Sequence, residues 1–182
     1  INSTLESKKY SKEAISLLFD NLEDAVNNPT RENKEKVAKA SNLAGKAINL
    51  TQTTACHAIS YPITSHYGIP HGHAVGLTLG EMLVHISKVS EKDSLDERGP
   101  EYVSKSITEI LQTMNANSSE EGRDKLTNLM ESIGLKTKLS SLGVEDIELI
   151  IKNGFNPQRI KNNPRKLTEE ELREILKRIS YS

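Results

Sequence analysis

Residues 56–80 read CHAISYPITSHYGIPHGHAVGLTLG, and this stretch decides the fold. Apart from histidine it holds no acidic or basic side chain, and the same is true of everything between Lys46 and Glu81. Its second half, Ala74 to Gly80, is uncharged on every side of a helix, and such helices are usually buried on most sides. We therefore expect a helix from His71 to about Val89 at the centre of the domain.

The first half of the stretch predicts a separate helix, from Thr54 to Ser65. Pro62 lies inside it, and a proline removes one backbone donor, so it should kink or end the helix nearby. Gly68 and Pro70 then act as stop and restart signals. The stretch thus predicts two helices joined by a short turn.

Upstream, apolar side chains recur at the spacing of amphipathic helices. Ser3 and Glu6 have the spacing of a capping box and predict the start of the first helix. The apolar stripe of that helix contains Ile15, Leu18, Phe19, Leu22, Ala25 and Val26. A second helix is expected from about Thr30 to Thr53.

Downstream of the central helix the same spacing predicts further helices separated by polar connections. These helices are expected at residues 101–114, 119–133 and 144–153 and after Thr168, which caps the last one. No segment settles into the alternation of a strand. The expected fold is all-α, with seven to nine helices in a single domain spanning residues 1–182.

Composition narrows the classes of function. The chain has 182 residues, 24 of them basic and 25 acidic, so the formal net charge is -1 and gives no reason to expect nucleic acid or an anionic membrane as a partner. The single cysteine, Cys56, excludes an intramolecular disulfide and a cluster of several cysteines around a metal. No apolar run approaches the roughly 20 residues of a membrane span.

The beginning of the chain bears on its location and extent. It shows no signal-peptide pattern, so we expect a cytoplasmic protein. The first residue is Ile1 rather than methionine. We therefore expect the chain to be a piece of a longer one.

Four of the five histidines fall within 17 positions: His57, His66, His71 and His73. Several imidazoles in charge-free surroundings fit a dry cleft that binds a cation, and they fit equally well a set of capping and core-edge histidines. Two antiparallel helices can bring His57 and His71 together, and two imidazoles supply half of a four-coordinate metal site. His71 and His73 are two apart and point to different sides of a helix, so His73 is expected beside the ligands or against the substrate. The remaining ligands must come from elsewhere in the fold or from outside this chain.

At this point the sequence resembles the iron-containing (group III) alcohol dehydrogenases. The resemblance rests on Ala44-Gly45-x-Ala47, on His57, and on Pro70-His71-Gly72 with its histidine fourteen positions later. The tail Asn163-Pro164-Arg165-x-Leu167-Thr168 is also similar to the end of that family. The resemblance implies the helical C-terminal domain of the dehydroquinate synthase-like fold, without the N-terminal domain that binds NAD(P) in the family.

The resemblance also implies a chemistry. It is hydride transfer between NAD(P) and a small aldehyde or alcohol, with Fe²⁺ or Zn²⁺ polarising the carbonyl oxygen. His57 and His71 match two of the four metal ligands, and the other two are expected upstream of Ile1. Many relatives have a histidine where this chain has Tyr61, and a phenol is a weaker proton shuttle at neutral pH. Tyr61 can still donate a hydrogen bond, and a proton relay through histidine would then fall to His66 or His73. We expect catalytic roles for Tyr61 and for His73.

Within the family the histidine segment is most similar to the phosphonoacetaldehyde reductase branch. The loop before Asn163 borders the substrate pocket in relatives, and here it carries Arg159 and Lys161. An arginine can bind a phosphonate through two parallel N–H bonds. Arg159, Lys161 and His66 are accordingly predicted to bind the substrate.

Two other readings stay open. The chain could be a non-catalytic helical module that binds a metal or a partner. It could also be a zinc enzyme related to glycerol dehydrogenase or dehydroquinate synthase, because imidazole suits iron and zinc alike. A homodimer is compatible with each of these readings.

Overall fold

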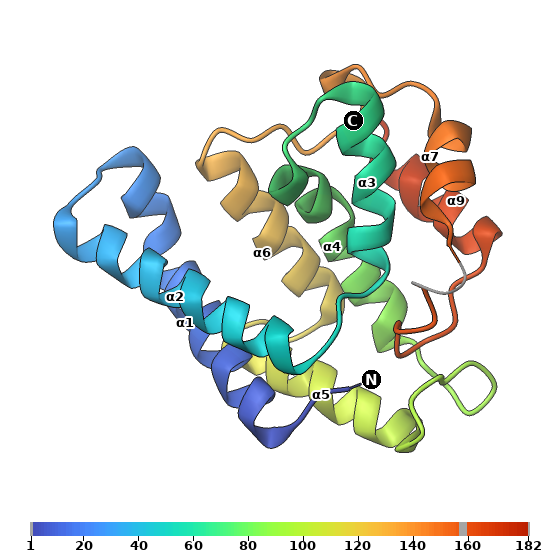
Figure 1. Ribbon diagram of the computed structural model, residues 1–182, viewed down its shortest axis with the longest axis horizontal. Helices are drawn as coiled ribbons and strands as arrows, with labels where there is room; N and C mark the ends of the chain where they lie inside the picture. The colour runs from blue at the N-terminus through green and yellow to red at the C-terminus, as the bar shows by residue number, and fades with distance from the viewer. Residues whose placement is uncertain (1, 157–159, 182) are drawn as a thin grey trace.

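The computed structural model describes residues 2–156 and 160–181 and is helical through most of them (Figure 1). Over these residues there are eight α-helices, one short 3-10 helix at Ser140–Leu142 and no strand beyond an isolated bridge between Ser94 and Arg165. The helices are α1 (Leu5–Asn27), α2 (Arg31–Leu50), α3 (Ala55–Tyr67), α4 (His71–Ser87), α5 (Gly99–Thr113), α6 (Ser119–Ser132), α7 (Ile147–Gly154) and α9 (Glu169–Arg178). The all-α prediction is confirmed, and so is the expected range of helices.

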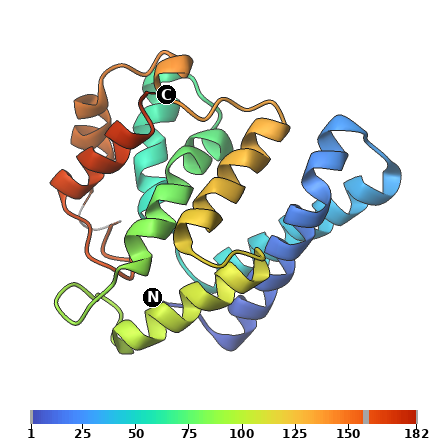
Figure 2. The ribbon, with the colours of Figure 1, turned by 180° about the vertical axis from the view of Figure 1, so that it is seen from behind.

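Helix α4 lies at the centre, as its uncharged first half predicts. It packs against α3, α5, α6 and α9, while α7 covers α3 and α9 covers α7 (Figures 1 and 2). Helices α1 and α2 form an antiparallel hairpin that projects to one side and packs chiefly on itself. The hairpin meets the rest of the molecule through contacts of α1 with α5 and α6.

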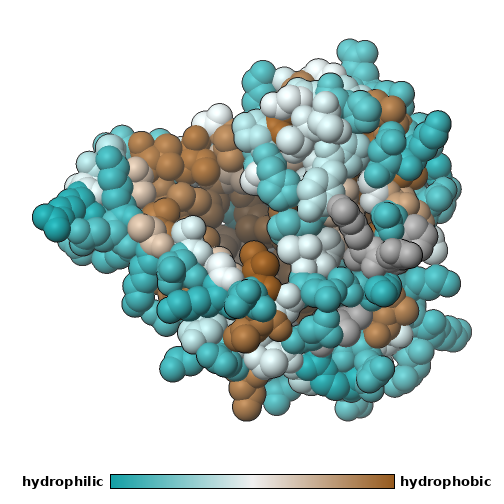
Figure 3. Space-filling view, viewed as in Figure 1, coloured by the Kyte–Doolittle hydropathy of each residue, from teal (hydrophilic) through white to brown (hydrophobic). Residues whose placement is uncertain are grey.

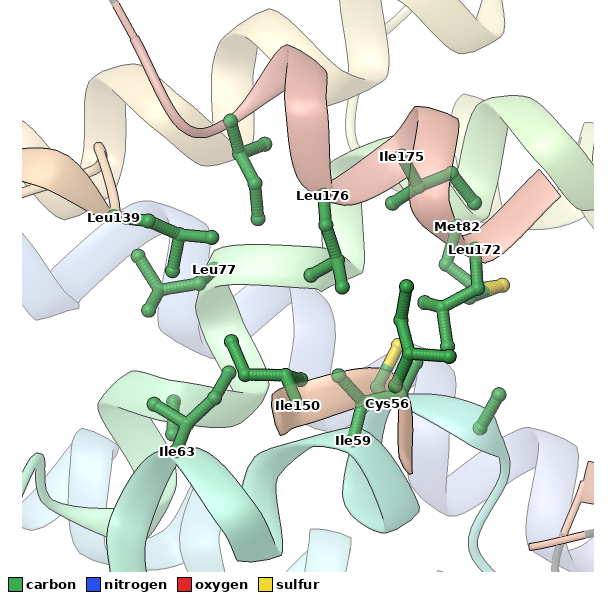
Figure 4. Close-up of a cluster of buried hydrophobic side chains, with 14 of the residues drawn as sticks. Cys56, Ile59, Ile63, Leu77, Met82, Leu139, Ile150, Leu172, Ile175 and Leu176 are labelled. Carbon is green, nitrogen blue, oxygen red and sulfur yellow. The ribbon is translucent and has the colours of Figure 1, made fainter. Parts of the chain in front are cut away.

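The main core lies between α3, α4, α7 and α9 (Figure 4). Ile59 and Ile63 of α3 are fully buried there, as are Ile150 of α7 and Leu172 and Leu176 of α9. Burying each such aliphatic side chain contributes roughly 1.5–3 kcal/mol relative to leaving it exposed. A smaller cluster joins α4 to α5 and α1, with Leu83, Val103, Ile107, Met114 and Ala116 as its buried members.

The first helix begins one residue later than its capping pattern predicts. Thr4, not Ser3, is the N-cap: its side chain accepts from the Ser7 amide, and the Ser7 hydroxyl accepts from the Thr4 amide. The Glu6 carboxylate accepts instead from the Tyr10 hydroxyl at 2.8 Å. The expected box at Ser3 and Glu6 is therefore wrong, because Ser7 completes the reciprocal pair and Glu6 bonds one turn onward.

Pro62 does not end its helix, since α3 continues past it to Tyr67. A proline leaves the carbonyl four residues earlier, that of Ala58, without its usual amide partner. Gly154 at the end of α7 lies against this turn, and a Cβ there would come within 3.1 Å of Ile59 Cα and 3.4 Å of the Ala58 oxygen. Gly68, in the left-handed conformation with φ at 69°, then ends α3 and turns the chain toward α4.

No helix in residues 2–156 and 160–181 has the length and apolar character needed to cross a membrane.

Candidate functional site

The turn between α3 and α4 brings His57 and His71 together. His57 lies in the first turn of α3, and His71 is the first residue of α4. Their ring centroids are 5.4 Å apart, and the ring planes are inclined by 62°. Two predicted metal ligands that are fourteen residues apart in the sequence are thus direct neighbours.

Tyr61 and Ser60 complete the surroundings of His71. The Tyr61 ring stacks on the His71 ring with centroids 5.6 Å apart and an angle of 23° between planes. Ser60, fully buried, places its Oγ 3.1 Å from Nδ1 of His71. Tyr61 is 48% exposed, so its phenol lies at the surface of the site.

Burial sets the charge state of His57. Desolvation lowers the pKa of His57 below the ordinary value, and the neighbouring His71 lowers it further. The neutral imidazole that results is the form that binds a metal ion. The buried Cys56 beside it behaves differently, because burial raises the pKa of its thiol to about 11 and keeps it protonated.

The residues present fit part of a metal site. Two adjacent imidazoles, one of them kept neutral by burial, are suitable donors for Fe²⁺ or Zn²⁺. In the part of the chain that the structure describes, no group of three or more His, Cys, Asp or Glu side chains is placed to hold an ion. A four-coordinate metal site would need further donors beside His57 and His71.

The other predicted site residues lie apart from this pair. His73 turns to the opposite side of α4, where its Nε2 donates to the Lys136 carbonyl oxygen at 2.7 Å. His66 is exposed near the end of α3, and Lys161 is exposed in the segment before Asn163. Arg159 lies outside the described residues. The structure thus joins His57, Tyr61 and His71 but not His73.

A polar network in which the fifth histidine takes part was missed at the sequence level. Arg165, from the Asn163-Pro164-Arg165 motif, donates through Nε to Asp93 at 2.7 Å and through Nη1 to the His85 carbonyl oxygen at 2.9 Å. The Leu95 amide donates to the Pro164 carbonyl, and the Lys166 amide donates to that of Asp93. The motif therefore fixes the 90–98 loop to the start of α9. The Asn163-Pro164-Arg165 motif is the feature of the sequence that could have indicated this network.

A pocket of about 360 Å³ lies between α4, α6 and α9 and contains none of the predicted site residues. Glu81 of α4 is buried at its wall and accepts from Arg123 at 3.3 Å and from Arg178 at 3.2 Å. The two guanidinium groups bind this carboxylate, so the cluster serves to join three helices.

The surface between the α1–α2 hairpin and the rest of the molecule is hollowed and largely hydrophobic (Figure 3). Exposed apolar side chains on the hairpin include Val26, Ile48 and Leu50. This face contrasts with the hydrophilic tip of the hairpin in the same view.

Comparison with known proteins gives one family. The profile of the Fe-containing alcohol dehydrogenase family, C-terminal part, matches residues 6–180. Phosphonoacetaldehyde reductase of Streptomyces viridochromogenes is 31% identical over 97% of this chain and 44% of its own length. 1,3-Propanediol dehydrogenase of Citrobacter freundii is 30% identical over 91% of this chain and 42% of its own length.

Solved structures agree with this match. Sulfoacetaldehyde reductase from Bifidobacterium kashiwanohense, in complex with NAD⁺, superposes with a TM-score of 0.80 at 29% identity. The alignment covers 97% of this chain and 44% of that one. The chain thus spans less than half the length of the relatives that it matches.

Proposed function

Since the chain belongs to the Fe-containing alcohol dehydrogenase family, we propose that it forms the metal-binding catalytic half of an NAD(P)-dependent aldehyde reductase or alcohol dehydrogenase. The observation that carries the proposal is the contact between His57 and His71, with ring centroids 5.4 Å apart. A family match that covers nearly the whole chain supports the reaction class. The two neighbouring imidazoles support a metal site in this half of the enzyme.

His57 and His71 would hold Fe²⁺ or Zn²⁺ together with ligands from the remainder of the enzyme. The ion, when bound, would act as a Lewis acid that polarises the carbonyl group of the substrate. The nicotinamide, when bound, supplies or accepts the hydride at the carbonyl carbon. Burial keeps His57 neutral, so a donor electron pair is available near neutral pH.

Tyr61 is the polar side chain that would meet the carbonyl group of the substrate. It stacks on His71 and is 48% exposed, so its hydroxyl can donate a hydrogen bond to a substrate oxygen beside the ligands. In that place it orients the carbonyl group. The hydrogen bond of His73 to Lys136 favours a supporting role for His73, which ties α4 to the 136–143 connection.

The proposed substrate is a short aldehyde that carries an anionic group, and phosphonoacetaldehyde is the first candidate. The names of two relatives, a phosphonoacetaldehyde reductase and a sulfoacetaldehyde reductase, support this class. Lys161 is exposed and cationic in the segment that the family resemblance assigns to the substrate pocket, and Arg159 precedes it by two residues in the sequence. Cationic side chains bind phosphonate and sulfonate groups through charge-assisted hydrogen bonds.

Reduction assays test the proposal. This chain, joined to the nucleotide-binding half expected from the family, is assayed with NADH and NADPH on phosphonoacetaldehyde, acetaldehyde, propanal and lactaldehyde. We expect kcat/KM to be highest for phosphonoacetaldehyde. Equal or higher values for the neutral aldehydes would remove the anionic-substrate assignment, and no turnover of any aldehyde would contradict the reductase assignment itself.

A further inference from the structure

We infer that Ser60 fixes the tautomer of His71, with the proton on Nδ1 and the lone pair on Nε2. Ser60 is a positioning residue in this proposal, since it acts through the imidazole and not on the substrate. The inference about the tautomer stands on the geometry of this chain alone. Its consequence for metal binding rests on the proposed function.

The direction of two hydrogen bonds carries the argument. Ser60 Oγ lies 2.8 Å from the carbonyl oxygen of His57, which can only accept, so the hydroxyl proton points there. The same Oγ lies 3.1 Å from Nδ1 of His71. A serine hydroxyl has one proton, and that proton is already used. Nδ1 of His71 must therefore be the donor in the second bond.

Because Ser60 is buried, water cannot replace the hydrogen bond that would be lost if Nδ1 of His71 were unprotonated. Ser60 is fully buried, so no solvent reaches a hydroxyl that has lost a partner. An unprotonated Nδ1 would place its lone pair against the lone pairs of Oγ, or would draw the proton away from the His57 carbonyl. Either change removes a hydrogen bond from a buried group, which is unfavourable.

The arrangement also couples the two proposed ligands. Ser60 joins the backbone of His57 to the side chain of His71, so the imidazole of one is oriented by the helical turn that carries the other. The nitrogen that a histidine offers to a metal is set by the hydrogen bond that its other nitrogen makes. Ser60 thereby leaves Nε2 of His71 as the donor nitrogen.

Nitrogen NMR tests the tautomer without any metal. The purified 182-residue chain is labelled with ¹⁵N-histidine and measured at about pH 8, and the His71 signals are assigned with His71→Gln. We expect a protonated Nδ1 and an unprotonated Nε2 for His71. A protonated Nε2 in the unsubstituted chain overturns the inference, and this measurement requires no substitution at Ser60.

A matched pair of variants adds a second readout. Ser60→Ala removes the hydroxyl, whereas Ser65→Ala removes a hydroxyl on the same helix that bonds the carbonyl of Pro62, also three residues back. We expect Ser60→Ala to shift His71 toward a mixture of tautomers and Ser65→Ala to leave its signals unchanged. His71 signals that stay unchanged in a folded Ser60→Ala chain would overturn the inference.

Zinc titration then separates the inference from the proposed function. Ser60→Ala should weaken Zn²⁺ binding roughly 10- to 100-fold, the usual effect of removing a partner of a metal-binding histidine. Equal Zn²⁺ affinity in the Ser60→Ala chain and the unsubstituted chain overturns the role of Ser60 in metal binding. If the unsubstituted chain shows the expected tautomer but binds no Zn²⁺ even when joined to the nucleotide-binding half, the inference is supported and the metal assignment under the proposed function fails.

Discussion

Arg165 binds His85 at two points, although 80 residues separate them in the sequence. Nη1 of Arg165 donates to the His85 carbonyl oxygen at 2.9 Å and lies 3.2 Å from its Nδ1. The Nε2 of His85 donates to the carbonyl oxygen of Lys166 at 3.1 Å, so a neutral His85 leaves Nδ1 free to accept from the arginine. The end of α4 is thereby fixed to the segment that precedes α9.

Replacing Arg165 by alanine should destabilise the domain. The change removes the hydrogen bonds to Asp93 and to His85, and the arginine side chain is only 17% exposed. Hydrogen bonds to charged groups contribute about 1.5–3 kcal/mol each in partly buried places, so we expect a loss of about 2–4 kcal/mol in the free energy of unfolding. Urea unfolding, monitored by circular dichroism, measures this loss in the free energy of unfolding. Arg173→Ala is the control, because its partners Glu148 and Glu170 are exposed, and it should cost much less. Equal losses for the two variants would contradict a special role for Arg165.

The stability of the folded chain should decrease as the pH is lowered, because of His85. Burial lowers the pKa of His85, and Arg165 lowers it further, while Glu171 and Asp93 act in the opposite direction. An unfolded chain keeps the ordinary histidine pKa of about 6.5, so below that pH it takes up a proton that the folded chain resists. The contribution is thus fully present above about pH 6.5 and is lost as the pH falls through the lowered folded pKa.

Urea midpoints between pH 8 and pH 5 measure this effect. We expect His85→Gln to flatten the slope in part, because His57, whose pKa is also lowered, adds to it in the same direction. A slope in His85→Gln as steep as that of the unsubstituted chain would show that His85 is not its source.

Gly154 allows α7 to approach α3, so Gly154→Ala should be destabilising. A Cβ at that position would come within 3.1 Å of Ile59 Cα and 3.2 Å of Pro62 Cγ, and backbone cannot move aside easily. We expect a loss of about 1–3 kcal/mol, the usual range for overpacking a core. Gly45→Ala is the matched control in α2, where a Cβ meets nothing within 4 Å, and it should stabilise the chain by up to about 1 kcal/mol. Thermal unfolding of the two variants compares them, and a neutral Gly154→Ala would refute the close approach of the two helices.

Metal binding should depend on His57 and His71 but not on His73. We expect the purified chain to bind Zn²⁺ or Fe²⁺ weakly, because two imidazoles are half of a four-coordinate set, and to show no dehydrogenase activity by itself. Calorimetric titration at pH 7.5 should lose its signal in His57→Ala and in His71→Ala. His73→Gln should keep it, because His73 bonds Lys136 on another side of α4. If His73→Gln loses metal binding while His57→Ala and His71→Ala retain it, the assignment of His57 and His71 as ligands is wrong.

Much of the fold followed from local patterns, and the departures have physical reasons. The uncharged run from Ala74 to Gly80 predicted the central helix, and Thr168 predicted the cap of the last one. The cap of α1 was misplaced because Ser7, not Glu6, returns the bond to the N-cap. The missing amide at Pro62 predicted a kink or an end of the helix, and the helix does not end there. The packing of Gly154 in α7 against that turn joins distant segments, and the local sequence does not determine such a contact.

The contacts of the candidate site likewise include some that the local sequence predicts and others that it does not. The distance between His57 and His71 depends on one turn between adjacent helices, so the spacing was sufficient to predict their proximity. The contacts of Arg165 with Asp93 and His85 join segments 72 and 80 residues apart, and no local pattern fixes such a pairing. The same holds for His73, whose carbonyl partner in Lys136 is 63 residues away.

The contacts of the projecting hairpin of α1 and α2 are ones that can form early in the folding of this chain. Its contacts join residues that are close along the sequence, and such contacts form quickly because little loop entropy is lost. The main core instead unites Ile59 of α3 with Leu176 of α9, from distant parts of the sequence. The hairpin can therefore form before the core closes, whereas Ile59 of α3 becomes buried only when α7 and α9 complete that core.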